Sequence, residues 1–551
     1  MAISDEHLLE AGVRCGLVEA GQLERLRLEA RRQRLSLLTM VQAHYRFPLS
    51  ALYRAVAEQY GMPYVDLDSL QVESTLLKKI PPSLVQRKLL LPVSDGAQVL
   101  LICGDPGDRA GIDSVQRLLG QVLPLVMTDL DVLQLKIKQA LAGKSAPEQS
   151  GAVTAEIDTD LVALLDGIIR EAYFYRASDI HLLPDAQGLR VRLRVDGKLR
   201  DYPLAAHAGA AAALVSRVKV LAGLDIAEQR MPQDGGFSYH LPRPIDKGFN
   251  IRVATAPTRL GERITLRLLG QEAFGLTLAD LGMMDEDLQQ FRKVIHRPYG
   301  MVLLTGPTGS GKSTTLFAAL QEINRPDINI MTVENPIEYV MHGVSQVQTG
   351  PKISFADALR SFLRHDPDVL MVGEIRDPET ADVAVKAAMT GHLVFSTLHT
   401  NNAVSAVTRL IDIGCEPFLI GSTVSAVIAQ RLVRRLCPHC RKPRLASPAE
   451  QAELGRDDDS VQIYEPGGCV ICQGSGFRGR LGLFETLWLD ESLARLVARG
   501  SDEEALEASA GQHLNFMWED GCRKVLLGMT TLDEVRDVAV HKTRSMSSGV
   551  S

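Results

Sequence analysis

One short stretch of the chain, GPTGSGKST, combines glycines, a lysine and hydroxyl residues between an apolar run and a helix-forming run. Backbone N–H groups of such a turn, with the positive end of the following helix, can surround phosphate oxygens. Lys312 would then reach the β and γ phosphates, and Ser313 would ligate Mg²⁺. The sequence therefore predicts a nucleotide-binding loop. Its residues are Gly306, Pro307, Thr308, Gly309, Ser310, Gly311, Lys312, Ser313 and Thr314.

Acidic residues follow two other apolar runs. Glu334 ends the run in INIMTVE, and Glu374 follows the run in VLMVGE. Because ligands gather at the carboxyl ends of strands in α/β sheets, we expect both carboxylates to face the phosphate loop from neighbouring strands. Glu334 would polarise the attacking water, and Glu374 would belong to the Mg²⁺ coordination sphere. The alternative is that both acids only cap loops.

Two histidines bracket a third apolar run. In TGHLVFSTLHTNN, His392 precedes the run and His399 follows it. A polar residue at the end of a strand often does no more than cap the backbone. The stretch alone therefore does not establish a catalytic role, and the motifs around it must decide.

Two pairs of cysteines have the spacing of a zinc site. CPHC contains Cys437 and Cys440, and CVIC contains Cys469 and Cys472. Two such pairs supply the four thiolates of a tetrahedral Zn²⁺ site, and His439 is a poorer ligand because four sulfurs already fill the shell. The sequence predicts a structural Zn²⁺ site, with a redox pair or free thiols as the alternatives.

The composition is that of a soluble globular protein. The 551 residues carry a formal net charge of -7, and 45% are hydrophobic, which argues against a protein built to coat nucleic acid. No run approaches the ~18 apolar residues of a membrane-spanning helix, and the N-terminus lacks the pattern of a signal peptide. We therefore expect a cytoplasmic protein of several domains.

The elements that must position these residues change in type along the chain. Helical spacing comes first, short strands follow, and beyond a Gly- and Ser-rich linker GLRVRLRVDGKLRDY predicts a β-hairpin with an Asp196-Gly197 turn. From about Leu278 to Arg434, strands and helices alternate as in a mainly parallel sheet. The predicted parts are an N-terminal domain 1–142 (helical 1–60, α/β 61–142), a linker 143–156, a second domain 157–272, a nucleotide-binding domain 276–434, a cysteine subdomain 435–485, a helical region 486–540 and a disordered tail 541–551.

The order of the motifs resembles one protein family. GPTGSGKST, TVENPIEY, VLMVGEIRDPETA and TGHLVFSTLHTNNA follow one another like the P-loop, Asp box, Walker B motif and His box of the secretion ATPases that assemble type II secretion pseudopili and type IV pili. SDIHL, APTRLGERITLRLL and EDGCRKVLLGMTTLDEV extend the similarity over about Ser178 to Val540. The resemblance implies an α/β fold: a RecA-like P-loop motor domain preceded by a PAS-like α+β domain and a small N-terminal α/β domain, with a tetracysteine zinc subdomain and a helical C-terminus.

The resemblance also implies roles for individual residues. His392 and His399 match the His box, which lies beside the phosphates and couples nucleotide state to domain movement, and His399 is the stronger candidate. Arg252 in FNIRVAT and Arg267 in ITLRLL match the arginine fingers, which reach the nucleotide of a neighbouring subunit. The expected catalytic residues are Glu334, Glu374, His399, His392, Arg252 and Arg267.

Two motifs depart from the family pattern. The Asp box, usually Glu-Asp-Pro, has Asn335 in the middle, which removes one negative charge near the phosphates. The usual Gln-Asp-Gly-Arg ends in Gly236 instead of arginine. Neither change removes a leading catalytic group, so we expect ATP hydrolysis with an altered rate or nucleotide affinity.

The resemblance further implies a homohexamer with ATP, Mg²⁺ and Zn²⁺ that drives assembly of a pilin-like filament. It would act at the cytoplasmic face of the inner membrane through a platform or docking protein of that membrane. The C-terminal EDGCRKVLLGMTTLDEV favours type II secretion, and type IV pilus assembly is the alternative. Some relatives bind cyclic di-GMP through Arg-Leu-Gly repeats, but the nearest match, Arg34-Leu35-Ser36, lacks the glycine and a clear second repeat. Nucleotide sensing there is therefore the less favoured interpretation.

Two other classes of function stay open. An inactive sensor would bind nucleotide without turnover, and a nucleic-acid translocase would use basic residues that flank the cysteines. The acidic net charge and the lack of interleaved aromatic residues make nucleic-acid binding the weaker hypothesis. The basic residues are Arg431, Arg434, Arg435, Arg441, Lys442 and Arg444.

Overall fold

The computed structural model describes residues 3–65, 67, 70–142, 154–186, 188–206, 208–270, 276–456 and 460–541. Residues 143–153 of the predicted linker, the connection 271–275 and the predicted disordered tail beyond residue 541 lie outside the described residues, whereas residues 154–156 of the linker belong to a helix. Contacts divide the chain into unit 1, residues 1–272 with 468–475, and unit 2, residues 273–467 with 476–551. Within the described residues, no helix is long and apolar enough to cross a membrane.

Unit 1 begins with four helices, as the apolar spacing of the first sixty residues predicts. Ser4 caps the first of them, because its hydroxyl accepts a hydrogen bond from the His7 backbone N–H at 3.3 Å. A small four-stranded sheet follows, in the order β1-β2-β3-β4. The elements are α1 Asp5–Arg14, α2 Ala20–Gln33, α3 Leu37–Tyr45, α4 Leu49–Gln59, β1 Gln71–Val72, α5 Ser74–Leu77, α6 Pro82–Lys88, β2 Leu90–Ser94, β3 Val99–Cys103, α7 Arg109–Leu119, β4 Leu125–Val126 and α8 Leu130–Ala142.

The rest of unit 1 is an antiparallel six-stranded sheet in the order β7-β6-β5-β10-β9-β8. Strict alternation places its apolar side chains on one face, where they pack against two helices. The predicted hairpin turn is confirmed, since Asp196 and Gly197 both adopt positive φ, 48° and 84°. The elements are α9 Thr154–Phe174, β5 Asp179–Asp185, β6 Gly188–Val195, β7 Lys198–Ala206, α10 Ala208–Leu221, β8 Gln233–Leu241, β9 Lys247–Thr258 and β10 Gly261–Leu268.

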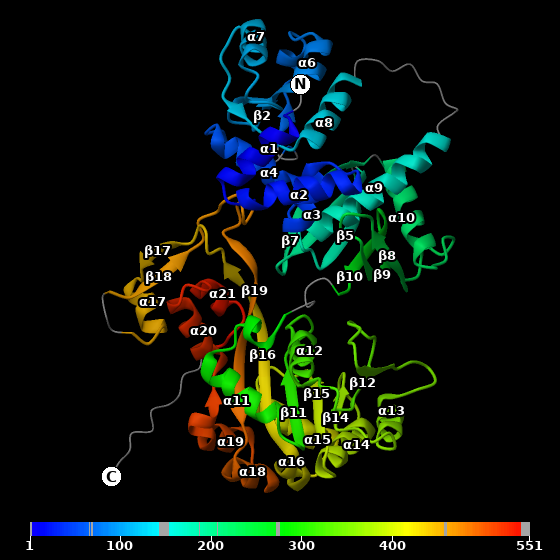
Figure 1. Ribbon diagram of the computed structural model, residues 1–551, viewed down its shortest axis with the longest axis vertical. Helices are drawn as coiled ribbons and strands as arrows, with labels where there is room; N and C mark the ends of the chain where they lie inside the picture. Colours follow the sequence, from blue (N-terminus) through cyan, green and yellow to red (C-terminus); the bar gives the residue numbers. More distant parts are fainter. Residues whose placement is uncertain are drawn as a thin grey trace. The chain divides into compact units, whose positions relative to one another are not determined.

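Unit 2 contains an eight-stranded sheet in the order β13-β12-β14-β15-β11-β16-β19-β20. Its strands from β13 to β16 run parallel, as predicted, and β19 and β20 add an antiparallel edge. The strands are β11 Gly300–Thr305, β12 Ile330–Glu334, β13 Val344–Gln348, β14 Val369–Val372, β15 Leu393–Leu398, β16 Val424–Leu436, β19 Phe477–Trp488 and β20 Leu514–Asn515. Figure 1 shows β12, β14, β15 and β11 side by side.

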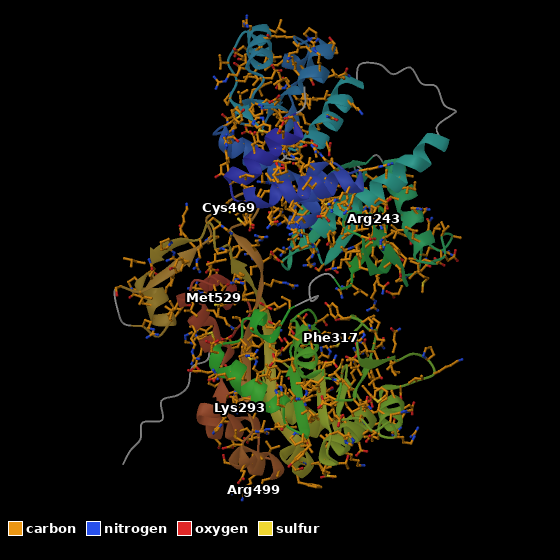
Figure 2. The ribbon with its side chains drawn as sticks, in the orientation of Figure 1. Arg243, Lys293, Phe317, Cys469, Arg499 and Met529 are labelled. Carbon is orange, nitrogen blue, oxygen red and sulfur yellow. The ribbon has the colours of Figure 1, made fainter. Side chains whose placement is uncertain are left out.

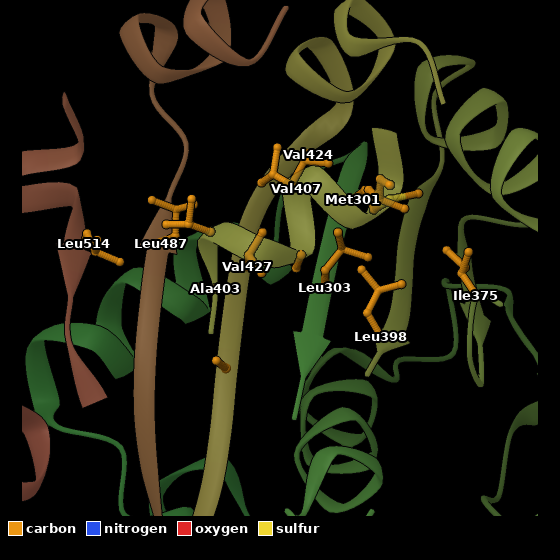
Figure 3. Packing of buried hydrophobic residues seen from close by; sticks show 14 of the residues in the cluster. Met301, Leu303, Ile375, Leu398, Ala403, Val407, Val424, Val427, Leu487 and Leu514 are labelled. Carbon is orange, nitrogen blue, oxygen red and sulfur yellow. The ribbon is translucent and has the colours of Figure 1, made fainter. Parts of the chain in front are cut away.

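Helices cover both faces of this sheet. Met301 and Leu303 of β11 enter one core with α13 to α16, whereas Val302 and Leu304 enter the opposite core with α11 and α12. Figure 3 shows the first of these cores, including Leu398 and residues of α15 and β19. Strands buried on both faces are held rigidly, so the residues at their carboxyl ends are well positioned. The covering elements are η2 Leu278–Leu281, α11 Asp285–Ile295, α12 Lys312–Ile323, α13 Phe355–Phe362, α14 Pro378–Met389, α15 Val404–Ile413 and α16 Pro417–Thr423.

Strands β16 and β19 are the longest pair of unit 2 and continue beyond the sheet toward the cysteine segment. Their register runs from Ala426 opposite Trp488 to Leu436 opposite Phe477. The remaining elements of unit 2 are β17 Lys442–Leu445, α17 Pro448–Glu453, β18 Gln462–Glu465, α18 Glu491–Ala498, α19 Glu503–Ala510, η3 Gly511–His513, α20 Met517–Leu526 and α21 Leu532–Arg536.

Candidate active site

The predicted phosphate loop connects β11 to α12, as its sequence context requires. Gly306 and Gly311 adopt positive φ, 139° and 91°. A Cβ on Gly306 would lie 2.5 Å from the Gln430 carbonyl oxygen, so a larger residue would not fit there. Among the described residues, the buried hydroxyl of Ser310 has no hydrogen-bond partner. An orphaned hydroxyl inside this loop fits a ligand that supplies the missing partner.

Lys312 is folded back onto this loop. Its ammonium Nζ donates to the carbonyl oxygens of Gly306 at 2.7 Å and Pro307 at 3.1 Å. Burial lowers the pKa of Lys312 to about 8, and the negative charge of Glu374 partly opposes that shift. A buried ammonium held only by carbonyl groups is a ready partner for an anion such as phosphate.

Glu374 and His399 meet at the carboxyl edge of the sheet. The Nε2 atom of His399 lies 3.3 Å from the Glu374 carboxylate. The same carboxylate oxygen lies 2.6 Å from Nε of Arg376, two residues further along the chain. Glu374 is therefore a mostly buried carboxylate with one histidine and one arginine beside it. Arg376 was not singled out from the sequence, although GEIRD places it next to the acid.

Glu334 ends β12, the neighbour of β14, so the prediction that the two acids follow neighbouring strands is confirmed. Its carboxylate accepts hydrogen bonds from Thr332 Oγ1 at 2.6 Å and Gln346 Nε2 at 3.0 Å. Burial nevertheless raises the pKa of Glu334. A carboxylate of raised pKa that is oriented by two donors is suited to interact with water or with its proton. Gln346 carried no signal in the sequence, because its role depends on the pairing of β12 with β13.

The loop that carries His399 crosses the carboxyl edge of the sheet. The hydroxyl of Thr305, at the end of β11, lies 2.7 Å from the hydroxyl of Thr400. At the far end of the loop, the Ala403 N–H donates to Glu485 of β19 at 2.8 Å. The loop is thus fixed to β11 at its start and to β19 at its end.

His392 lies away from this cluster, contrary to the expectation that both histidines flank the phosphates. It precedes β15, and its backbone carbonyl accepts from the Gly300 N–H at the opposite end of β11 from the phosphate loop. Its ring Nδ1 lies 2.9 Å from the carbonyl oxygen of Ala387 in the last turn of α14. The physical reason is the direction of the strand, because six extended residues separate the two ends of β15 by about 20 Å. This position supports a structural role for His392.

Arg252 and Arg267 belong to unit 1 and are not part of the cluster that unit 2 assembles. They lie opposite each other on β9 and β10, and both are exposed. Arg267 donates from Nε to the Asp179 carboxylate at 2.9 Å. Their face of the sheet is the one that α9 and α10 leave uncovered. A role in hydrolysis for either arginine therefore stays a prediction.

The four predicted zinc ligands converge. The Sγ atoms of Cys437, Cys440, Cys469 and Cys472 all lie within 4.8 Å of one another. The sulfurs of Cys469 and Cys472 are 3.7 Å apart, close to the ~3.8 Å edge of a tetrahedron with Zn–S distances of ~2.3 Å. Cys469 lies in the segment between β18 and β19 (Figure 2). The donor set and its spacing therefore fit Zn²⁺.

Comparison with known families decides the relationship of the chain. Residues 154–537 match the family described as Type II/IV secretion system protein, and residues 60–146 match the MshEN domain. The chain belongs to the type II/IV secretion system protein family. Among curated members, "Type II secretion system ATPase E" of Vibrio cholerae is 47% identical over 397 residues, which cover 71% of this chain and 78% of that protein.

Other members of the family cover more of the chain. "Type II secretion system protein E" of Pseudomonas aeruginosa is 42% identical over 83% of this chain and 95% of its own length. "Type IV pilus assembly ATPase PilB" of Myxococcus xanthus is 37% identical over 95% and 97%. Among solved structures, the ATPase DotB of Legionella pneumophila has a TM-score of 0.51 at 22% identity, covering 71% of this chain and 97% of that one. That likeness shows the shared fold.

The basic residues near the cysteines are largely engaged inside unit 2 of this family member. Arg434 donates to Glu534 from Nη2 at 2.6 Å, and Arg444 donates from Nη1 to Glu450 at 2.8 Å. The guanidinium of Arg441 lies over the ring of Tyr464. These contacts engage three of the six basic residues within unit 2, which weakens the hypothesis of a free basic surface for nucleic acid.

Proposed function

We propose that this protein is the ATPase of a type II secretion system, which hydrolyses ATP to drive assembly of a pilin-like filament. The observation that carries the proposal is the cluster at the carboxyl edge of unit 2, where the phosphate loop with its buried Lys312 lies near the Glu374–His399 pair. Family membership supports the same reaction.

In this mechanism, Lys312 exchanges its two carbonyl contacts for phosphate oxygens when nucleotide binds. The backbone N–H groups of Gly306 to Thr314 and the start of α12 contribute further positive partial charge. The hydroxyl of Ser313 and the carboxylate of Glu374 would hold Mg²⁺, which neutralises charge that develops on the phosphates. The negative charge of the phosphates offsets the desolvation cost of the buried ammonium. The affinity for ATP should therefore depend strongly on Lys312.

Water is handled by the carboxylates of unit 2. Glu334, oriented by Thr332 and Gln346, would polarise the attacking water. His399 would hold Glu374 in place and couple the charge at the γ-phosphate position to its own loop, which ends at Ala403 and is held there by Glu485. Hydrolysis changes the charge beside Glu374 and His399. We therefore expect the loop of residues 399–403 to change its position when ATP is hydrolysed.

The arginine fingers would come from a neighbouring chain. Arg252 and Arg267 lie in unit 1, whereas the nucleotide loop lies in unit 2, so a homohexamer would let unit 1 of one chain complete the site of the next. Arginine contact with the γ-phosphate in the transition state is worth about 10³ to 10⁵ in rate. The four cysteines would hold one structural Zn²⁺ per chain.

The protein would act in the cytoplasm, at the inner membrane, through an inner-membrane platform or docking protein. Assembly of type IV pili is the second candidate, because two PilB proteins match over 90% and 95% of this chain. Identities of 42–47% to type II secretion proteins, against 37–39% to the PilB proteins, favour secretion. Binding of cyclic di-GMP by the N-terminal helices would be an added property, and Arg34 ends α2 there in a left-handed conformation.

The test places Lys312→Ala in the chromosomal gene and measures exported protein in the medium and pili on the cell surface. We expect the purified variant to lose ATP turnover and the strain to lose secretion but keep its pili. Loss of pili with normal secretion would establish the alternative system. Undiminished ATP turnover by Lys312→Ala would refute the site itself.

A further inference from the structure

Strand β16 continues past the end of β11 and lies against the phosphate loop. Thr305, the last residue of β11, is opposite Ala429, so the next residues of β16 run beside the loop. The side-chain amide of Gln430 accepts from Thr315 Oγ1 of α12 at 2.8 Å. A Cβ on Gly311 would lie only 2.8 Å from Gln430 Nε2. This part of β16 is therefore fixed relative to the loop, and so is the backbone of Arg431.

Arg431 is a partly buried cation without a carboxylate partner. Burial lowers the pKa of its guanidinium. It donates from Nη2 to the Asn401 side-chain carbonyl at 3.2 Å, in the loop that carries His399. Among the described residues, no carboxylate forms an ion pair with it, whereas Arg376 contacts Glu374 and Arg434 contacts Glu534. A cation that loses water without gaining a counterion is unfavourable, so an anion is expected nearby in the working protein.

The phosphate loop itself indicates which anion this is. Arg431 follows Gln430 in β16, and Gln430 lies directly against Gly306 and Gly311 of the loop that carries Lys312. Two neighbouring cations, one held by carbonyl groups and one by an amide, repel each other in the free protein. A nucleotide phosphate would satisfy both, and a guanidinium can bind phosphate oxygens through two parallel N–H groups.

We propose that Arg431 binds the phosphates of the nucleotide held by its own chain. The proposal rests on the proposed function and adds a cation in cis to the arginine fingers expected from the neighbouring chain. Because Arg431 also holds Asn401, its contact would join the phosphates to the loop that carries His399.

The experiment compares Arg431→Gln with Arg435→Gln in the full-length protein. Arg435 is an exposed residue of the same strand, so the control removes the same charge away from the loop. Calorimetric titration with ATP, ADP and GTP should show the affinity of Arg431→Gln for all three nucleotides lowered by about tenfold or more. Arg435→Gln should stay within about twofold. Wild-type affinity and turnover in Arg431→Gln would overturn the proposal.

Two further measurements show why Arg431→Gln loses nucleotide affinity. If Arg431 touched the base instead, the ratio of ATP to GTP affinity would change, and that result would also overturn the proposal. If Arg431→Gln unfolds at a lower temperature, Arg431→Lys keeps the charge, and its affinity should lie between those of Arg431→Gln and the wild type. An Arg431→Lys affinity equal to that of a folded Arg431→Gln would contradict a role for the charge.

Subunit mixing tests that Arg431 acts in cis. At ATP concentrations too low to fill the site of Arg431→Gln, this variant and Lys312→Ala each impair the site of their own chain, so mixing them should restore no ATP turnover. Recovery on mixing would place Arg431 in a neighbour's site and overturn the proposal. Full turnover by Lys312→Ala alone would instead refute the proposed function, whatever Arg431 does.

Discussion

The two ends of β15 carry the same side chain in different surroundings. His399 follows the strand and lies 3.3 Å from Glu374, beside the phosphate loop. His392 precedes the strand and contacts the last turn of α14 through the Ala387 carbonyl oxygen. Both histidines lie within one sequence motif. They differ in position because His392 lies at the amino end of the strand and His399 at its carboxyl end. In a parallel sheet, the end of the strand on which a residue lies is therefore as informative as its type.

The largest effect that tests this difference is expected at Glu374. Glu374→Gln keeps the size of the side chain but removes the negative charge beside His399, so kcat should fall by about 10² to 10⁴. ATP should still bind, because Lys312 and the loop are unchanged. Rapid-mix measurement of phosphate release, with nucleotide binding followed separately, checks both parts. A turnover close to that of the wild type would mean that the carboxyl edge is not the catalytic edge.

The two histidines themselves come next. His399→Ala should lower kcat about tenfold or more, since Glu374 loses a positioning contact. His392→Ala should change kcat less than about twofold, because its contacts are with α14. Asparagine at either position, which keeps one donor, serves as the milder variant. Equal losses at the two positions would show that strand direction does not separate their roles.

A third effect follows from the ionisation of Lys312. Burial lowers the pKa of this ammonium to about 8 in the free protein, and bound phosphate favours the charged form, which raises that pKa. ATP affinity should therefore be constant below this pH and fall above it, by at most about tenfold per pH unit. Titrations across this range check the slope, and Lys312→Ala should show no such dependence. A slope of the opposite sign would mean that Lys312 does not meet the phosphates.

The smallest expected effect lies at the amino end of the sheet. Loss of the hydrogen bond between His392 and the Ala387 carbonyl in His392→Ala should lower the free energy of unfolding by about 1 kcal/mol. Denaturant titrations of His392→Ala and the wild type give the change in the free energy of unfolding. ATP turnover of the same two proteins, measured in parallel, shows whether catalysis changes as well. If His392→Ala kept its stability but lost ATP turnover, His392 would have a catalytic role and not a structural one.

The phosphate loop and the acids at the carboxyl edge of the sheet could be predicted from the sequence. The residues that would do the chemistry are also the ones that determine the local backbone there. The phosphate loop needs glycines at positive φ, and Gly306 and Gly311 supply them where the sequence places them. The neighbouring positions of Glu334 and Glu374 followed from the rule that parallel strands end at one edge. The four cysteines converge as predicted, because the two Cys-x-x-Cys pairs carry the ligand spacing of a zinc site.

Other features depend on strand pairing, which the sequence does not state. Gln346 reaches Glu334 only because β13 pairs with β12. Arg431 belongs by sequence to a basic run before the cysteines, yet the register of β16 with β11 brings it to the phosphate loop. Two of its basic companions instead bind Glu534 and Glu450. In each case the contacts of the side chain depend on which strands pair and in which register. The residues next to it in the sequence do not indicate that pairing.

The register of β16 with β19 makes the cysteine segment an insertion between two paired residues. Leu436 lies opposite Phe477, so the chain leaves the ribbon and returns to it at the same rung. A hairpin connection of roughly two to five residues would close that gap without shifting the strands. A shortened connection would therefore keep the register of the two strands, but it would remove Leu454 and Ile463 from the core that they share with Trp518. The cysteine segment is thus an insertion in the order of the chain and, at the same time, part of the packing of unit 2.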